Sequence, residues 1–526
     1  MQQRITINFN TASKTTDKTT ILEYCRSNGI TGIETPCGGK GTCGKCKVTV
    51  TKPYYKDVLA CQTKICDGME IIVGRKESTG TKEDSMVVLT NGENVSEKFN
   101  EHVNRNVEDT LAACDIGTTT VVCYLIDKET GQIISTRSGA NPQRSFGADV
   151  LSRIDAAARA DDNDKANGGL QMMQTQIVSL LNGWISEMLT ECGRTKVSRF
   201  SVAGNTVMCH LLMGISPEKM GKAPFMPDEY FGREFNPLDI GLENCQTMII
   251  FPAVSGFVGG DITAGMMETV NCNELTLYLD IGTNGEMALG KGDRYVCCAT
   301  AAGPAFEGAQ IELGMPASKG AVDKVWLEGR RIKYSVIGND RPVGLCGSGL
   351  IDALAVLLKA GIIDENGTIL SGQELPILFR SYVFEVEAEE TAQSTEPSLA
   401  VHIAPGVYIT QEDIRKLQLA KGAIAAGIEV LFKEYGCTPC NIDVLTFAGG
   451  FGNYIDKASA AAIGLFPQEL LDKAKEVGNA AGNGAVSAAL SQDAWERALE
   501  ISKDMRYIEL ASYPGFDEMY VEHMNF

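Results

Sequence analysis

The chain has 526 residues, of which 44% are hydrophobic, and its 47 basic and 67 acidic residues give a net charge of −20. This length predicts three or four domains with cores of their own, and so acidic a chain is a poor candidate for binding a nucleic-acid backbone. Its longest uncharged runs, 201–216 and 246–260, are too short to span a bilayer. Because the first residues also lack the pattern of a signal peptide, we expect a cytoplasmic protein with no membrane partner.

The first 75 residues predict a small α+β domain. Hydrophobic and polar residues alternate over 5–9, as in a half-buried strand, and residues 20–28 predict a short helix. Further strands are expected at 48–50, after a glycine-rich loop, and at 69–73. Residues 76–109 are mostly charged and polar, so they predict a linker to the rest of the chain.

The remainder of the chain predicts a large α/β structure, because apolar strand-like runs alternate with helical stretches. We expect a first lobe or middle domain over 110–195 and a large C-terminal domain over 196–526. The expected strands are 111–116, 121–126, 275–281 and 444–450, and the expected helices include 149–160, 170–189 and 412–434.

A short segment occurs twice in this region. The sequence DIGTTT at 115–120 returns as DIGTNG at 280–285, and each copy lies between two apolar runs. A strand–turn–strand unit that is repeated once predicts two related lobes rather than a solenoid of many repeats.

A cysteine cluster marks the N-terminal domain. Cys37, Cys43 and Cys46 lie in one glycine-rich loop, and Cys61 follows. In a cytosolic chain with 17 cysteines, clustered thiols indicate metal or redox ligands rather than disulfides. Four thiolates can hold a [2Fe–2S] cluster, two on each iron, and the glycines between them allow positive φ and close backbone approach.

The fourth ligand is the least determined by spacing. The C-x5-C-x2-C pattern has one residue more in its first gap than the plant type and is nearer to the adrenodoxin type, and its last gap is short. We expect Cys61 as the ligand and keep Cys66 as the alternative. A structural zinc site is a further alternative, although its ligands usually form two close pairs. Cys437 and Cys440 form a CxxC pair with no second pair nearby, for which we expect no ligand role.

The repeated segment is a candidate phosphate-binding turn. It does not match a Walker A loop, but a glycine at a tight bend can present N–H groups to phosphate oxygens, and threonine hydroxyls can join them. A carboxylate at the end of a buried strand can hold Mg²⁺ or its waters. Glu286 can join it, and either Glu286 or Glu307 can orient a water. The candidate residues are Asp115, Gly117, Thr118 and Thr119 in the first copy, and Asp280, Gly282, Thr283, Asn284 and Glu286 in the second.

Two later glycine turns, at 448–454 and 478–485, complete a resemblance to the actin, sugar kinase and Hsp70 superfamily of ATPases. This resemblance implies two RNase H-like lobes that hold Mg·ATP between phosphate turns, one from each lobe. It also implies an adenosine-binding turn in the second lobe. The implied adenosine-turn residues are Gly449, Gly450, Gly452 and Asn453. Residues 203–205 and 347–349 would be inter-lobe or nucleotide-proximal turns, or purely structural ones.

The pairing of a one-electron cluster with such an ATPase resembles the reductive activators of corrinoid proteins. The resemblance covers nearly the whole chain and includes NPQRSFGADVLSRI (141–154), AGNTVMCHLL (203–212), LCGSGLIDA (345–353) and AGGFGNYI (448–455). It implies an N-terminal ferredoxin-like β-grasp domain with a [2Fe–2S] cluster. The implied activity is ATP-dependent one-electron reduction of a Co(II) corrinoid methyl-transfer protein to Co(I). A low-potential electron donor and a homodimer are implied as well.

Three other functions remain open at this point. An activator of 2-hydroxyacyl-CoA dehydratase type would hold a [4Fe–4S] cluster between two subunits and would lack the N-terminal domain. A sugar or acetate kinase of the same superfamily would need an acceptor pocket but no cluster. A chaperone-like ATPase would respond to peptides and not to a corrinoid protein.

Overall fold

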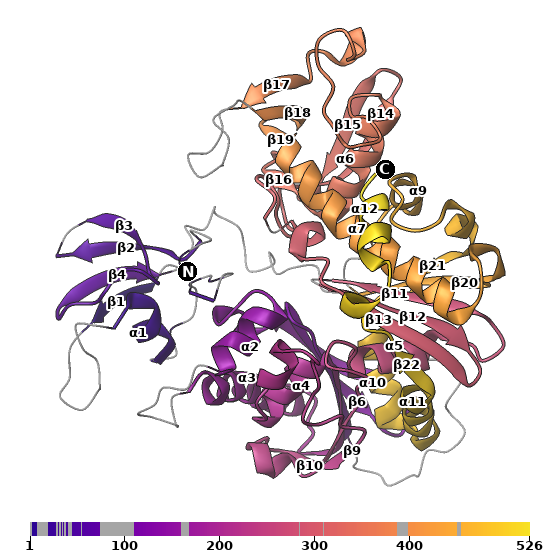
Figure 1. Ribbon diagram of the computed structural model, residues 1–526. Helices are drawn as coiled ribbons and strands as arrows, with labels where there is room; N and C mark the ends of the chain where they lie inside the picture. The colour runs from indigo at the N-terminus through magenta and orange to yellow at the C-terminus, as the bar shows by residue number, and fades with distance from the viewer. Residues whose placement is uncertain are drawn as a thin grey trace. The chain divides into compact units, whose positions relative to one another are not determined.

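The computed structural model describes residues 3–7, 19–27, 30, 33, 35, 38–39, 41, 45–53, 55–73, 110–158, 168–282, 284–308, 310–386, 398–449 and 454–526. Two compact units divide the chain close to residue 260 (Figure 1). The second unit runs from Gly260 to the C-terminus except for Ala489–Ser491, which belong to the first. The expected linker over 76–109 lies outside the described residues.

The N-terminal domain in the first unit is a four-stranded sheet with one helix. Its elements are β1 (Gln3–Ile7), α1 (Ile21–Ser27), β2 (Lys47–Lys52), β3 (Lys56–Leu59) and β4 (Met69–Val73). The strands follow the order β1-β4-β2-β3, and all neighbours are antiparallel. Buried residues alternate along β4, and Ile21, Leu22 and Cys25 of α1 pack against the same core. These elements confirm the expected α+β domain. The sequence analysis missed β3, whose KDVL sequence does not alternate and is exposed or half-buried.

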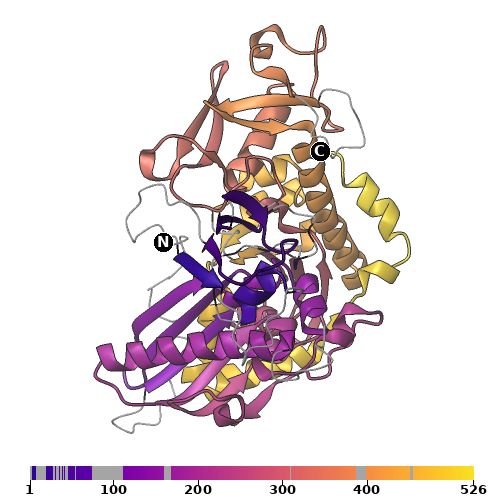
Figure 2. The same ribbon diagram turned by 90° about the vertical axis from the view of Figure 1, so that its left-hand side faces the viewer.

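The rest of the first unit is a six-stranded mixed sheet with helices. Its elements are β5 (Thr110–Ile116), β6 (Thr120–Asp127), β7 (Ile133–Ala140), α2 (Val150–Ala158), α3 (Gly169–Glu191), β8 (Val197–Gly204), α4 (Thr206–Met213), β9 (Arg233–Phe235) and β10 (Cys245–Ile250). The strand order is β7-β6-β5-β8-β10-β9. Strands β5, β6 and β7 are antiparallel neighbours, whereas β8 runs parallel to β5 and β10 parallel to β8. The long helix α3 lies along this sheet (Figure 2) and buries Ile177, Leu181 and Ile185, spaced by one helical turn.

The boundary that we expected between residues 195 and 196 does not coincide with a division of the structure. Strand β8 pairs with β5, so that Asp115 lies opposite Ala203. The chain on both sides of residue 195 therefore builds one sheet, and this unit continues to Gly259. Parallel strands need a long crossover connection, so this pairing is a long-range contact that the local sequence pattern does not reveal.

The second unit contains a sheet that shares a five-stranded core with the first. Its strands are β11 (Thr276–Ile281), β12 (Gly285–Lys291), β13 (Arg294–Thr300), β20 (Val444–Ala448), β21 (Ala474–Glu476) and β22 (Met505–Tyr507), in the order β21-β20-β11-β12-β13-β22. As in the first sheet, the first strand pairs antiparallel with the second and the second with the third, and the first is parallel to the fourth. Beyond the fourth strand, β21 is parallel to β20 as β10 is to β8. The remaining strands differ, since β9 pairs antiparallel with β10 whereas β22 pairs parallel with β13 at the opposite edge. The repeated segment therefore marks two lobes of one architecture, as expected.

A large insertion separates β13 from the rest of the second lobe. It contains one three-stranded sheet of β14 (Ala321–Glu328), β15 (Arg331–Val336) and β16 (Gly344–Leu345). A second three-stranded sheet contains β17 (Val383–Val386), β18 (Ser398–Ala404) and β19 (Val407–Thr410). The sequence analysis placed no strands here, because these segments are short and partly exposed.

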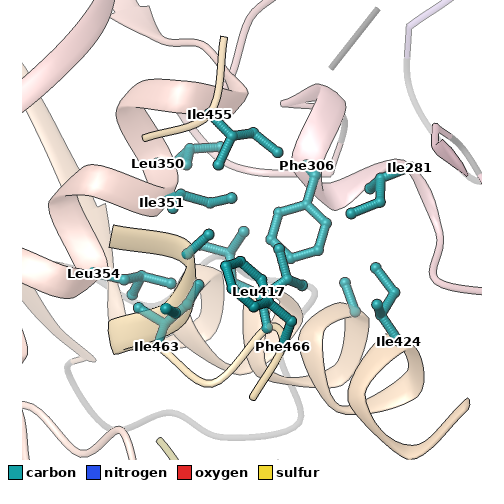
Figure 3. Packing of buried hydrophobic residues seen from close by; sticks show 14 of the residues in the cluster. Ile281, Phe306, Leu350, Ile351, Leu354, Leu417, Ile424, Ile455, Ile463 and Phe466 are labelled. Carbon is teal, nitrogen blue, oxygen red and sulfur yellow. The ribbon is translucent and has the colours of Figure 1, made fainter. Parts of the chain in front are cut away.

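Seven helices are described in the second unit: α5 (Gly260–Thr269), α6 (Gly347–Lys359), α7 (Gln411–Tyr435), α9 (Lys457–Ala462), α10 (Ala480–Leu490), α11 (Gln492–Asp504) and α12 (Phe516–Glu522). Helix α7 begins with a capping box between Thr410 and Asp413 and ends at Gly436, whose φ is +76°. Leu417 and Ile424 of α7 pack with Phe306 and Phe466 in the core of this unit (Figure 3). Among the described helices of either unit, none is long and apolar enough to cross a membrane.

The C-terminal residues are fastened to α7 by a buried lysine. The ammonium group of Lys421 donates hydrogen bonds to the carbonyl oxygens of His523, at 2.6 Å, and Asn525, and it faces the ring of Phe526. Lys421 is only 2% exposed, and this burial lowers its pKa to about 8. The ordinary value of a lysine in an unfolded chain is about 10.4.

This lysine gives a pH-dependent prediction. Between about pH 8 and 10.4 the unfolded chain binds more protons at Lys421 than the folded chain, so stability at this site rises with pH in that window. We expect the melting-temperature difference between the wild type and Lys421→Met to grow in favour of the wild type as the pH rises. Lys433→Met, at a half-exposed position on the same helix, serves as the control. A difference that shrinks with pH would contradict the assignment.

Candidate functional site

Two of the predicted cluster ligands lie side by side in the N-terminal domain. The Sγ atoms of Cys46, which precedes β2, and Cys61, which follows β3, are 3.2 Å apart. A disulfide would require about 2.05 Å, whereas two thiolates that bind one metal ion lie within van der Waals contact of each other. Cys37 and Cys43 lie outside the described residues. The separation of the Cys46 and Cys61 sulfurs is short enough for both thiolates to bind the same iron of a [2Fe–2S] cluster, which binds two cysteines per iron.

The glycine-rich loop folds over the turn that carries Cys61. Gly38, Gly39 and Gly41 have φ values of +65°, +90° and +83°, a region that L side chains rarely adopt. A Cβ atom on Gly39 would lie 3.9 Å from the Cβ of Cys61, and one on Gly41 would lie 2.3 Å from the amide nitrogen of Gln62. The loop therefore approaches the Cys61 turn by its backbone, as a loop around an iron–sulfur cluster must. This proximity favours Cys61 over Cys66 as the fourth ligand.

Most of the remaining described cysteines are buried. Burial raises the pKa values of Cys114, Cys297 and Cys298, which keeps these thiols protonated and unlike metal-binding thiolates. Burial also raises the pKa of Cys437, while its neighbour Cys440 is exposed. Within the described part of the chain, no three His, Cys, Asp or Glu side chains come together as a metal site. Cys37 and Cys43 are not in that part.

The first candidate phosphate turn follows β5. Asp115 is half-buried near the end of the strand, and the N–H of Gly117 donates to the carbonyl oxygen of Thr120 at 2.9 Å, which closes the bend. Thr118 and Thr119 form its half-exposed tip. A Cβ atom on Gly117 would lie 2.8 Å from the Thr120 oxygen, so only glycine allows this bend.

Two residues that the sequence analysis did not single out hold this turn in place. The Nδ2 of Asn141 donates to the carbonyl oxygen of Gly117 at 2.8 Å, and its backbone N–H donates to that of Thr119 at 2.9 Å. The guanidinium of Arg153, completely buried, donates to the carbonyl oxygens of Thr118 and Gly147. Both residues belong to the motif over 141–154. This motif indicated the family resemblance, but it did not predict these contacts.

The second candidate turn has a different carboxylate arrangement. Asp280 at the end of β11 lies directly opposite Glu286 of β12, so both side chains leave the same face of the sheet. Glu286 is buried, and the pair places two carboxylates on one face of the sheet at the end of β11. The N–H of Gly282 donates to the carbonyl oxygen of Asn284 at 2.9 Å. Thr283 lies outside the described residues. The arrangement suits a divalent cation, since Mg²⁺ is held by one or two carboxylates together with waters and phosphate oxygens.

The end of β20 lies beside this carboxylate pair. Because β20 is parallel to β11, Ala448 lies opposite Asp280 and Gly449 follows immediately. A Cβ atom on Gly449 would lie 2.5 Å from the Oδ1 of Asp280. A carboxylate oxygen of Glu307 also approaches the second turn, 3.9 Å from where a Cβ atom of Gly282 would be. Gly450, Gly452 and Asn453 lie outside the described residues.

Gly449 gives a prediction for the second turn. Gly449→Ala is expected to push Asp280 out of position and to weaken the binding of Mg·ATP by about tenfold or more, because the φ of +80° costs an alanine about 1–2 kcal/mol and the methyl group would overlap Oδ1. Isothermal titration with Mg·ATP measures the affinity. Gly406→Ala is the matched control, since its φ of +76° imposes the same strain with nothing within 4 Å. Equal affinities in the two variants would refute the role of the Gly449–Asp280 contact.

The other glycine motifs begin helices. Asn205 caps α4 by accepting a hydrogen bond from the N–H of Val207, and residues 347–349 form the buried first turn of α6. The last glycine turn precedes α10, where Asn479 accepts from the N–H of Gly482. In the described contacts, these residues cap or begin helices.

Three family models match the chain in succession. Residues 6–66 match a 2Fe-2S iron-sulfur cluster binding domain, residues 111–271 match the RACo middle region, and residues 274–526 match the C-terminal domain of RACo, the ASKHA domain. The fold is therefore a ferredoxin-type domain followed by an ATPase domain of the actin, sugar kinase and Hsp70 class, as the sequence analysis expected.

Three relatives match most or nearly all of the chain. The corrinoid activation enzyme RamQ of Eubacterium limosum is 32% identical over an alignment that covers 96% of each chain. The [Co(II) methylated amine-specific corrinoid protein] reductase of Methanosarcina barkeri is 25% identical over 79% of this chain and 76% of its own. A solved structure of a reductive activator for corrinoid, iron-sulfur protein is 30% identical, covers 97% of this chain and 96% of its own, and matches with a TM-score of 0.67. The chain belongs to the family of reductive activators of corrinoid proteins.

Proposed function

We propose that this protein reductively activates a corrinoid methyl-transfer protein by reducing its cobalt from Co(II) to Co(I) at the expense of ATP. The observation that carries the proposal is the full-length similarity to a corrinoid activation enzyme, together with the 2Fe-2S domain and the ASKHA domain that this chain combines. When bound, the [2Fe–2S] cluster supplies a one-electron carrier, and the cobalt of the partner protein is the substrate that gains the electron.

We assign the cluster ligands to Cys37, Cys43, Cys46 and Cys61. The 3.2 Å separation of the Cys46 and Cys61 sulfurs supports this assignment. The left-handed glycines of the loop support it as well, since they let the backbone approach the Cys61 turn. Fully buried thiols such as Cys297 remain protonated and take no part.

We assign nucleotide binding to the two repeated turns. The first turn contributes Asp115, Gly117, Thr118 and Thr119. Asn141 and Arg153 hold its backbone in place by hydrogen bonds. In the second, Asp280 and Glu286 would hold Mg²⁺ and orient the attacking water, a pairing supported by their direct opposition in the sheet. Gly282, Thr283 and Asn284 would bind phosphate, and Gly449, Gly450, Gly452 and Asn453 would lie toward adenosine.

The energetics explain why ATP is needed. Plant-type [2Fe–2S] clusters have potentials near −400 mV, and each further 100 mV uphill costs about 2.3 kcal/mol per electron. A Co(I) corrinoid demands a stronger reductant than such a cluster, so the step requires another source of free energy. ATP can supply it only by binding two conformations of the protein differently, which is the task of a two-lobed ATPase.

The test is an anaerobic reduction. The reduced protein is mixed with a Co(II) corrinoid methyl-transfer protein, with and without Mg·ATP, and the visible spectrum is followed for Co(I). We expect Co(I) only with Mg·ATP. If the cluster is intact and ATP is hydrolysed but no corrinoid protein yields Co(I), the assigned substrate is wrong. Sugar-dependent release of ADP would instead support a kinase.

The partners beyond the corrinoid protein follow from the family resemblance. We propose a low-potential electron donor that reloads the cluster and a homodimer as the working form. Sedimentation velocity at micromolar concentration tests the dimer, and a monomer over the whole range would refute it.

A further inference from the structure

The iron–sulfur domain makes a specific contact with the lobe that follows it in the same compact unit. The carbonyl oxygen of Ser145, at the end of a 3₁₀ turn over Pro142–Ser145, accepts hydrogen bonds from two residues of the N-terminal domain. Arg26 donates from Nε at 3.0 Å and from Nη2 at 2.5 Å, and Thr35 donates from its hydroxyl at 2.6 Å. The Arg26 guanidinium also lies over the ring of Phe146, 4.9 Å from its centre.

This contact lies next to the cluster loop. Thr35 is two residues before Cys37, and it is 1% exposed. Gly38, directly after Cys37, approaches the same segment so closely that a Cβ atom would lie 3.3 Å from the carbonyl oxygen of Phe146. The Ser145 carbonyl accepts hydrogen bonds from three donor atoms, Arg26 adds a cation–π contact, and Thr35 is buried. These contacts indicate a specific interface between the iron–sulfur domain and the lobe that follows it.

Residues 141–153, the segment that contains Ser145, also hydrogen-bond to the first phosphate turn. Asn141, at its beginning, binds the carbonyl oxygens of Gly117 and Thr119, while Arg153, at its end, binds those of Thr118 and Gly147. The segment is itself tightly built, since Asn141 caps the 3₁₀ turn and a Cβ atom on Gly147 would lie 2.4 Å from Ser152. A rigid piece of chain therefore touches the nucleotide turn at one side and the cluster loop at the other.

We propose that residues 141–153 are a relay that couples nucleotide binding at the Gly117–Thr119 turn to docking of the iron–sulfur domain through Arg26 and Thr35. The proposal rests on the nucleotide site of the proposed function. A phosphate that orders the turn changes the positions of the Thr118 and Thr119 carbonyls. Asn141 and Arg153, which donate to these carbonyls, pass the change along residues 141–153. The Ser145 carbonyl, which accepts hydrogen bonds from Arg26, moves as a result. By linkage, the coupling is reciprocal: docking of the domain changes nucleotide affinity by the same factor.

The experiment measures both directions of the coupling in the anaerobic, cluster-loaded full chain. Hydrogen–deuterium exchange is recorded with and without Mg·ATP, and isothermal titration gives the affinity for Mg·ATP. In the wild type we expect Mg·ATP to change exchange in residues 142–147 and also in 21–38 of the iron–sulfur domain. In Arg26→Ala the change in 21–38 is expected to vanish, and the affinity for Mg·ATP to shift by about fivefold or more. The visible spectrum shows that the cluster is retained.

Lys52→Ala is the matched control, because Lys52 is an exposed cation of the same domain whose partner is Glu70. It should behave as the wild type does. The relay is refuted if Mg·ATP binds to the wild type without affecting residues 21–38, or if Arg26→Ala binds Mg·ATP as tightly as the control. Failure of the wild type to bind Mg·ATP at all would overturn the nucleotide site and the relay together, and Mg·ATP binding without Co(I) formation would overturn only the assigned substrate.

Discussion

Cys61→Ser is expected to remove the native visible spectrum of the [2Fe–2S] cluster and to abolish Co(I) formation, while ATP hydrolysis continues. The sulfur of Cys61 lies 3.2 Å from that of Cys46, and the two would complete the coordination of one iron. Replacing one thiolate by a hydroxyl leaves that iron with a poor ligand. Anaerobic reconstitution followed by absorption and electron paramagnetic resonance spectroscopy measures the cluster, and a malachite-green assay measures phosphate release.

Cys66→Ser is the matched control for this experiment. Cys66 is half-buried in the same domain and five positions further along the chain. Its replacement should leave the spectrum and Co(I) formation close to those of the wild type. If Cys66→Ser loses the cluster and Cys61→Ser keeps it, the fourth ligand has been assigned to the wrong cysteine.

Asp280→Asn is expected to give the opposite pattern: an intact cluster spectrum, but ATP hydrolysis reduced by about 100-fold or more and no ATP-dependent Co(I). Asp280 faces Glu286 across the sheet and touches the backbone at Gly449. The neutral amide keeps the shape of the carboxylate but removes the charge that would hold Mg²⁺. Removing one preorganised electrostatic contact to a transition state costs about 100- to 1,000-fold in rate.

The control for Asp280 lies in the next hairpin of the same sheet. Asp293 is exposed in the turn between β12 and β13, and Asp293→Asn removes the same charge at a position away from the end of β11. It should hydrolyse ATP at the wild-type rate. Unchanged hydrolysis in Asp280→Asn, measured at saturating Mg²⁺ and ATP, would remove this residue from the metal site.

The two variants separate the halves of the proposed function. A cluster defect with normal hydrolysis and a hydrolysis defect with a normal cluster should both abolish Co(I), because the electron and the free energy come from different domains. If Asp280→Asn still gave Co(I) at the wild-type rate, reduction would not depend on ATP hydrolysis. In that case the energetic argument for the two-lobed domain would fail.

Local patterns in the sequence were sufficient for several parts of the fold. Alternation over residues 5–9 predicted β1, a strand was expected at 69–73 where β4 lies, and the helical stretches predicted α2, α3 and α7 within a few residues. The repeat of 115–120 at 280–285 predicted two lobes, and both lobes share a five-stranded core with the same strand order and directions. These features depend on neighbouring residues or on an exact recurrence, which a single sequence displays directly.

The identities of the candidate site residues also came from the sequence, but their contacts did not. Sequence spacing left Cys61 and Cys66 as alternatives, and the approach of Cys61 to Cys46 favours the first. Residue types suggested Asp280 and Glu286 as metal ligands, while only strand register placed them opposite each other. Gly449 was expected near adenosine, and its tight contact with Asp280 emerged only from the pairing of β20 with β11.

The sequence by itself determined the chemistry available to this protein: four clustered thiols, two repeated acidic glycine turns and a family motif pattern along the chain. Tertiary structure decided which of these groups meet. The crossover that pairs β8 with β5 carries the first lobe past residue 195. The buried Arg153 and Asn141 hydrogen-bond to the first phosphate turn, and they belong to the segment 141–153 that accepts hydrogen bonds from Arg26. Such contacts join residues far apart in the chain, and long-range pairing and burial are set by the packing of whole elements, which no local pattern of residue types encodes.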